Sequence, residues 1–197
     1  MQEFSTSDLT ERERARIMKT AVTPRPIAWI SSVDSEGNEN LAPFSAYNYI
    51  SSANPVIVFN SPNEDSGGLK DTARNALATG EFAVNVVTEP LLEAMDTTSA
   101  SLPPTECEFD FADVPRTECQ MIDAPRVDNC SVTMECKLYD SIEIHDRISI
   151  FGDVVHFHVS ESVMTDGEID MMQLPTVGRL GGPYYTIAKP VEFERQF

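Results

Sequence analysis

Residues 70–72 place a lysine, an aspartate and a threonine at the start of a predicted helix. That helix runs to about Thr79 and is closed by Gly80. The first turn of a helix has free backbone N–H groups and the positive end of the helix dipole, and both favour an anion. Lys70 and Thr72 therefore predict a phosphate-binding site. The alternative is an ordinary N-cap at Asp71 or Thr72 beside a solvated lysine.

A second group of polar side chains lies in residues 23–48, TPRPIAWISSVDSEGNENLAPFSAYN. Residues 27–33 are a predicted strand, entered along a path that two prolines hold extended. A polar turn separates this strand from a second apolar run, residues 41–50, which contains Ser45 and Asn48. Because polar groups inside a buried strand need partners, we interpret this stretch as the wall of a ligand site.

Most of the remaining chain reads as short strands. They are predicted at residues 55–60, 81–87, 131–144 and 148–159, and the last two form a hairpin. Residues 1–20 form a helical extension capped at Ser7 or Asp8, and Thr88 caps a further short helix. Residues 97–129 are a long irregular excursion. The sequence predicts a single domain, residues 1–197, that is mainly β with short helices, in a small closed or split β-barrel.

Alternation along residues 131–144 predicts a half-buried strand. Val132, Met134 and Cys136 face one way, whereas Thr133, Glu135 and Lys137 face the other. The second set is therefore expected on the outer side of the sheet.

The cysteines and histidines form no catalytic or metal-binding pattern in the sequence. The four cysteines have no C-x-x-C spacing and are predicted to be free thiols, with Cys136 in the core. His156 and His158 share one strand face, but no cysteine or carboxylate pattern completes a metal-binding set. We predict no metal and no catalytic residue, and we expect the histidines to be solvent-facing or hydrogen-bonded.

Charge is the most skewed property of the chain. It has 32 acidic and 14 basic residues, for a net charge of -18. Nucleic acid and anionic membranes are poor partners for such a surface. No apolar run approaches the roughly 20 residues that span a bilayer, so a cytoplasmic protein is predicted. One interpretation of the acidity is a halophilic source, and the alternative is an acidic mesophilic protein.

Motifs in five places resemble those of the flavin reductase-like, FMN-binding split-barrel family, which includes flavoredoxins and the small reductase components of two-component monooxygenases. They are PRPIAWISSVDxxGxxNLAPFSxYN, KDTxRN (70–75), GEFAVNVV (80–87), LEAMDTTSA (92–100) and RLGGPYY (179–185). They occur in the family's order and cover most of the chain. The resemblance implies a split β-barrel that binds FMN, tightly or as a substrate, near the interface of a homodimer.

The resemblance also implies nine flavin-binding residues. Those expected near the flavin ring are Trp29, Ile30, Ser31, Ser45 and Asn48. Those expected near the phosphate are Ser61, Lys70 and Thr72. Tyr184 is expected to reach a flavin bound mainly by the neighbouring subunit. For Arg25 the choice stays open between the phosphate or ribityl chain and a carboxylate partner.

The expected activity is hydride transfer from NAD(P)H to the flavin, with electrons passing on to a monooxygenase or another acceptor. The cofactor performs this chemistry, and the protein supplies position and electrostatics. Because the G-x-G-x-x-G fingerprint is absent, NAD(P)H is expected to dock transiently on the flavin. Two alternatives stay open: a flavoredoxin-like carrier that NAD(P)H does not reduce directly, and a non-catalytic ligand-binding barrel.

Overall fold

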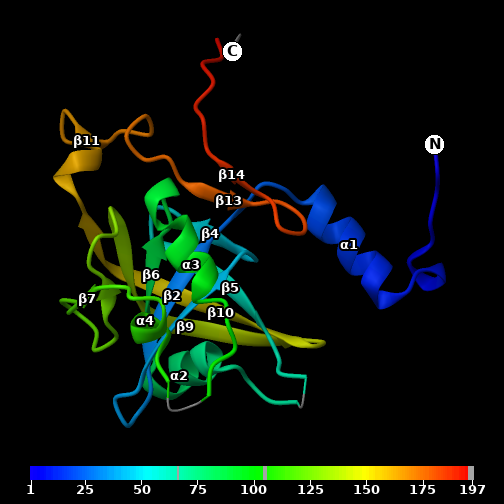
Figure 1. The fold of residues 1–197 in the computed structure, drawn as a ribbon, viewed down its shortest axis with the longest axis horizontal. Helices are drawn as coiled ribbons and strands as arrows, with labels where there is room; N and C mark the ends of the chain where they lie inside the picture. Colours follow the sequence, from blue (N-terminus) through cyan, green and yellow to red (C-terminus); the bar gives the residue numbers. More distant parts are fainter. Residues whose placement is uncertain (66, 104–105, 195–197) are drawn as a thin grey trace.

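The computed structural model describes residues 1–65, 67–103 and 106–194, and strands dominate it (Figure 1). In these ranges the main sheet has seven antiparallel strands in the order β3-β2-β6-β9-β10-β5-β4. Their bounds are β2 Ala28–Val33, β3 Glu39–Phe44, β4 Tyr47–Ser51, β5 Val56–Pro62, β6 Glu81–Val86, β9 Val132–Ile144 and β10 Arg147–Val159. The predicted class, mainly β with short helices, is confirmed, as is the hairpin of β9 and β10.

The sheet must curl because of how β3 and β4 are joined. These strands lie at opposite edges of the sheet, yet only Ser45 and Ala46 connect them. Such a connection reaches about 11 Å at most, whereas a flat sheet of seven strands would be roughly 29 Å wide. The two edges therefore come together at this corner, as in a split barrel. The prediction of one strand over residues 41–50 was wrong, because the chain turns at the corner.

The barrel interior holds the larger hydrophobic core. Aromatic rings pack in tilted and edge-to-face pairs there, with centroids 5.1 Å apart for Phe44 and Phe59 and 5.2 Å apart for Phe59 and Phe82. Helix α2 (Asp71–Thr79) contributes the buried Ala73 and Ala76 to this core. Gly80 ends the helix in a left-handed conformation with φ 76°, which confirms the predicted helix end.

A second core lies on the outer side of β2 and β3. Trp29 and Leu41 pack there against residues of the excursion, including the buried Phe109 and Val127. The covering elements are η2 (Glu89–Leu91), α3 (Leu92–Thr97), α4 (Glu108–Phe111), β7 (Arg116–Thr117) and β8 (Arg126–Val127). The excursion is therefore more regular than predicted, although residues 104–105 of it lie outside the described part of the chain. Thr88 precedes η2, but its side chain makes no capping hydrogen bond.

The excursion also changes the surroundings of β9. Thr133 and Glu135 are fully buried, so the predicted half-buried strand was wrong over its first half. The reason is that Ile122 and Ala124 of the excursion pack over this side of the sheet, against Ala83 of β6. Lys137, Leu138 and Tyr139 follow the predicted alternation, but beyond Tyr139 both faces of the strand are largely exposed, and Ile142 and Ile144 are each 48% exposed.

The terminal segments pack more loosely. Helix α1 (Glu11–Ala21) has no buried residue and lies apart from the main sheet (Figure 1). It follows the turn η1 (Thr6–Asp8), and its cap is Thr10, in a capping box with Glu13, rather than Ser7 or Asp8.

A three-stranded sheet pairs β1 (Arg25–Pro26), β13 (Val177–Arg179) and β14 (Tyr185–Ile187). Before it come η3 (Glu161–Val163), β11 (Met164–Thr165) and β12 (Glu168–Ile169). No helix in the described ranges is long and apolar enough to cross a membrane.

Candidate functional site

The start of α2 has the features of an anion site. Lys70 occupies the N-cap position, with φ -64° and ψ 157°, and its side chain makes no capping hydrogen bond. The N–H groups of the first turn have no intrahelical acceptors and gain none from the Lys70 side chain. Lys70 itself is exposed at this end of the helix. Neither Asp71 nor Thr72 is the N-cap, so the alternative of an ordinary capped helix does not hold.

Thr72 is tied to β3 by a buried hydrogen bond. The Asn40 Nδ2 group donates to Thr72 Oγ1 over 2.8 Å. Because the threonine oxygen accepts here, its own hydroxyl proton is left to donate elsewhere. Asp71 is paired with Arg74 through an ion pair, which offsets the carboxylate charge next to Lys70. At the helix start Lys70 is exposed, Arg74 is paired with Asp71, and the Asn40–Thr72 bond ties the helix to β3.

The corner between β3 and β4 is pinned from β5. Both the backbone N–H and the Nδ2 group of Asn60 donate to the carbonyl of Ala46, each over 2.9 Å. The Oδ1 atom of Asn60 in turn accepts from Ser149 Oγ at 2.5 Å. Ser45 is half-buried at this corner, with its hydroxyl 3.5 Å from Arg25 Nε. Ser45 is therefore presented on a fixed piece of backbone.

The Arg25 side chain forms hydrogen bonds mainly with backbone carbonyls. Its guanidinium donates to the carbonyls of Lys19 (2.5 Å), Val22 (3.0 Å) and Leu180 (2.7 Å). Burial and the neighbouring Arg179 lower its pKa. Of the two options that the sequence left open, no carboxylate pairs with Arg25 within the described ranges. Arg25 instead fastens the end of α1 and the β13–β14 turn to the corner that carries Ser45.

Three of the predicted ring-contacting residues are fully buried. Trp29 donates through Nε1 to Thr98 Oγ1 at 2.9 Å in the outer core, whereas Ile30 packs inside the barrel. Ser31 Oγ accepts from Asn85 Nδ2 at 3.1 Å. All three have 0% relative exposure, so they support the wall from within. A direct contact between their side chains and a ligand would require other groups to move.

The other predicted residues differ in their exposure to solvent. Ser61 on β5 is buried, and its hydroxyl donates to the carbonyl of Pro62 at 3.3 Å. Asn48 is exposed on β4, with its Oδ1 accepting from the N–H of Tyr49. Tyr184 is 68% exposed in the turn between β13 and β14. Lys70, Asn48 and Tyr184 are therefore open to a ligand or a partner in this chain.

Asn40 and Asn60 are positioning residues to which the sequence analysis gave no role. Each holds a residue or corner of the predicted site through its side-chain amide. The available signal was a polar amide next to or inside an apolar strand run. A further cluster joins Arg179, Tyr185 and Asp96: the arginine lies 4.3 Å above the tyrosine ring, and the tyrosine hydroxyl bonds Asp96. Burial, helped by that bond, raises the pKa of Tyr185 to about 12.

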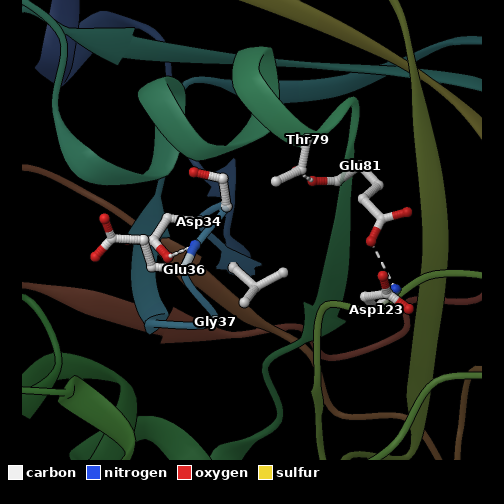
Figure 2. Close-up of a pocket in the computed structure, with 8 residues that line it drawn as sticks. Asp34, Glu36, Gly37, Thr79, Glu81 and Asp123 are labelled. Carbon is white, nitrogen blue, oxygen red and sulfur yellow. Dashed lines mark hydrogen bonds between the residues drawn. The ribbon is translucent and has the colours of Figure 1, made fainter.

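An acidic hollow on the surface lies away from these residues. It lies between the β2–β3 turn and the start of β6 (Figure 2). Its volume is about 440 Å³. Its lining includes the carboxylates of Asp34, Glu36, Glu81 and Asp123. None of the nine predicted residues lines it. A group of four carboxylates repels an anion, so this hollow is a poor site for a phosphate.

Comparison with known proteins gives a consistent result. A family model described as "Flavin reductase like domain" matches residues 18–172. An uncharacterised protein from Aquifex aeolicus is 36% identical over 168 residues, covering 85% of this chain and 86% of that protein. Nitrilotriacetate monooxygenase component B from Bacillus cereus superposes with a TM-score of 0.92 at 32% identity, over 99% and 98% of the two chains. A split-barrel domain protein from Shewanella frigidimarina has a TM-score of 0.85 at 22% identity over the full length of both chains, which shows the split-barrel fold.

Proposed function

Since the chain belongs to the flavin reductase-like domain family, we propose that it binds FMN and is an NAD(P)H-dependent flavin reductase. The family supports a flavin as cofactor or substrate, and the start of α2 supports the choice of FMN. There an uncapped helix end, Lys70 and the Thr72 hydroxyl suit a terminal phosphate. This phosphate-compatible helix start is the observation on which the proposal depends.

In this proposal the protein's residues position the cofactor rather than react. Bound flavin supplies the hydride-accepting chemistry. Lys70, Thr72 and Ser61 hold the phosphate end. Ser45 and Asn48 donate or accept at the edge of the ring, and the Asn60 bonds to Ala46 keep that edge in place. The buried strand β2, with Trp29, Ile30 and Ser31, keeps the wall behind the ring rigid.

We further propose that the protein acts as a homodimer and passes electrons to a monooxygenase or another acceptor. Large apolar side chains are exposed on β4, where Tyr49 is 67% and Ile50 56% exposed. Phe157 is 52% exposed on β10, beyond the part of that strand that pairs with β5. Exposed apolar surface of this kind is typical of an interaction site. The exposed Tyr184 would then reach the flavin of the partner subunit. Similarity to a monooxygenase component B supports a monooxygenase as acceptor.

The phosphate contact is tested by comparing two flavins. Replacing Lys70→Ala together with Thr72→Ala should weaken FMN binding at least tenfold, because charge-assisted hydrogen bonds contribute about 1.5–3 kcal/mol each. Riboflavin lacks the phosphate, so its affinity should change little. Both affinities can be measured by titration calorimetry on protein freed of flavin.

Lys137→Ala is the matched control, since it removes an exposed lysine from β9 and should leave both affinities unchanged. Circular dichroism of the double variant checks that losing the Asn40–Thr72 bond has not unfolded the chain. Equal weakening of FMN and riboflavin in a folded double variant would place the phosphate elsewhere.

A further inference from the structure

Three metal-ligand side chains from separate parts of the chain meet on the outer side of β9. They are Cys119, Glu135 and His158, and their ligand atoms all lie within 4.8 Å of one another. Cys119 comes from the excursion between β7 and β8, Glu135 from β9 and His158 from β10. Spacings along the chain do not reveal this set, because only the packing of the excursion on the sheet brings its members together.

Glu135 is the fixed member of this cluster. Its side chain is 0% exposed, and it accepts from the N–H groups of Gln120 and Met121, each over 2.7 Å. Its Oε1 atom also lies 2.5 Å from His158 Nε2. Burial raises the pKa of this carboxyl, but the hydrogen bonds from Gln120, His158 and Met121 lower it overall.

Cys119 is poorly suited to act as a nucleophile in this cluster. Burial and the charge of Glu135 raise the pKa of Cys119 to about 12. A reactive cysteine needs a lowered pKa instead. The three groups also share no residue with the nine predicted for the flavin, so the cluster is separate from the proposed reductase site.

We propose that Cys119, Glu135 and His158 bind one zinc ion. Thiolate sulfur, carboxylate oxygen and imidazole nitrogen are the ligands that zinc takes in proteins. One thiolate and one carboxylate balance the charge of Zn²⁺, which favours binding in a partly buried position. The His158 side chain is 18% exposed, so water can reach the fourth coordination position. The ring of His156 lies beside that of His158, with ring centroids 4.8 Å apart.

The zinc would fasten the excursion to the barrel. Glu135 already holds the loop at Gln120 and Met121 through backbone hydrogen bonds, so a Cys119 ligand extends an existing link. The excursion in turn covers Trp29 and the outer core. Zinc is therefore expected to stabilise the packing of the excursion over Trp29 and the outer core, without taking part in flavin chemistry.

The proposal is tested by zinc titration of the full-length chain after treatment with a chelator. One zinc ion should bind per chain, measured by competition with a chromophoric chelator. Cys119→Ser and His158→Gln should each lower the affinity at least tenfold, since each removes a direct ligand. Cys107→Ser and His145→Gln are matched controls: Cys107 is a half-buried thiol of the same excursion, and His145 is exposed in the β9–β10 turn. Neither control should change the affinity.

Limited proteolysis of the excursion gives a second readout that does not depend on flavin. Zinc should slow cleavage within residues 106–129 in the natural chain and in both controls, but not in Cys119→Ser or His158→Gln. If Cys119→Ser does not fold, the partly exposed His158→Gln still decides the question. A chain that binds no zinc, or that binds it equally well in folded ligand variants, would overturn the proposal.

Discussion

At the scale of single residues, Asn85 has the largest set of buried hydrogen bonds around the wall. Its Nδ2 group donates to the carbonyl of Trp29 (3.0 Å) and to Ser31 Oγ (3.1 Å). Its Oδ1 atom accepts from the N–H of Val127 (3.0 Å) and from Thr133 Oγ1 (3.1 Å). One side chain therefore joins β2, β8 and β9 behind the proposed flavin site.

Replacing Asn85→Ala should lower the free energy of unfolding by roughly 2–4 kcal/mol, because it leaves buried backbone groups without partners. Urea unfolding followed by circular dichroism measures the loss. The exposed Asn54→Ala is the control and should change stability by less than about 0.5 kcal/mol. A loss no larger than that of Asn54→Ala would mean that the network adds little to stability.

The candidate site was partly predictable at this scale. Lys70 and Thr72 drew attention because they are polar residues at a predicted helix start, and Ser45 because it is a polar residue within an apolar run. Their supports could not, since Asn40 lies 32 positions from Thr72 and Asn60 lies 14 from Ala46. The burial of Glu135 was missed for the same reason, because alternation along one strand does not reveal what packs on its outer face.

At the scale of elements, close packing between β10 and β6 depends on Gly152. A Cβ atom at this position would lie 2.5 Å from Phe82 Cζ and 3.1 Å from Cys136 Cβ. Phe82 is fully buried in the barrel core and Gly152 lies at an irregularity in the β9–β10 register. The glycine therefore lets the aromatic ring fill the space between the strands.

Gly152→Ala should destabilise the fold by about 1–3 kcal/mol, since the added methyl overpacks the core. Thermal and urea unfolding measure this loss. Replacing Phe82→Leu removes the ring that the added methyl would meet. The double variant Gly152→Ala/Phe82→Leu should therefore lose less stability than the sum of the losses in the two single variants. Strict additivity would show that the alanine does not press on this ring.

Strands and helix ends were predicted well where their signal is local. Helix α2 and its Gly80 end, β6 and the β9–β10 hairpin all follow from periodicity and turn residues. The corner at Ser45 and Ala46 was missed because no glycine marks it. The two strands can be told apart only by the pairing of β4 with β5, which is not visible in the local sequence.

At the scale of the whole molecule, the net charge of -18 sets the dependence on salt. Like charges on a compact chain repel each other, and a Debye length of about 3 Å at 1 M salt screens that repulsion. If the acidity is an adaptation to high salt, the melting temperature should rise steeply from low to molar KCl. Calorimetry in a series of KCl concentrations measures this, and a flat response would exclude the halophilic interpretation.

The central claim is that NAD(P)H reduces a flavin held by this chain, and anaerobic stopped-flow spectroscopy tests it most directly. Protein loaded with FMN is mixed with NADH or NADPH while the flavin absorbance is followed, with dithionite as a positive control for reduction. The account predicts that at least one nicotinamide bleaches the flavin, at a rate that rises with its concentration. Bleaching by dithionite but by neither nicotinamide would contradict the reductase function and favour an electron carrier that holds FMN.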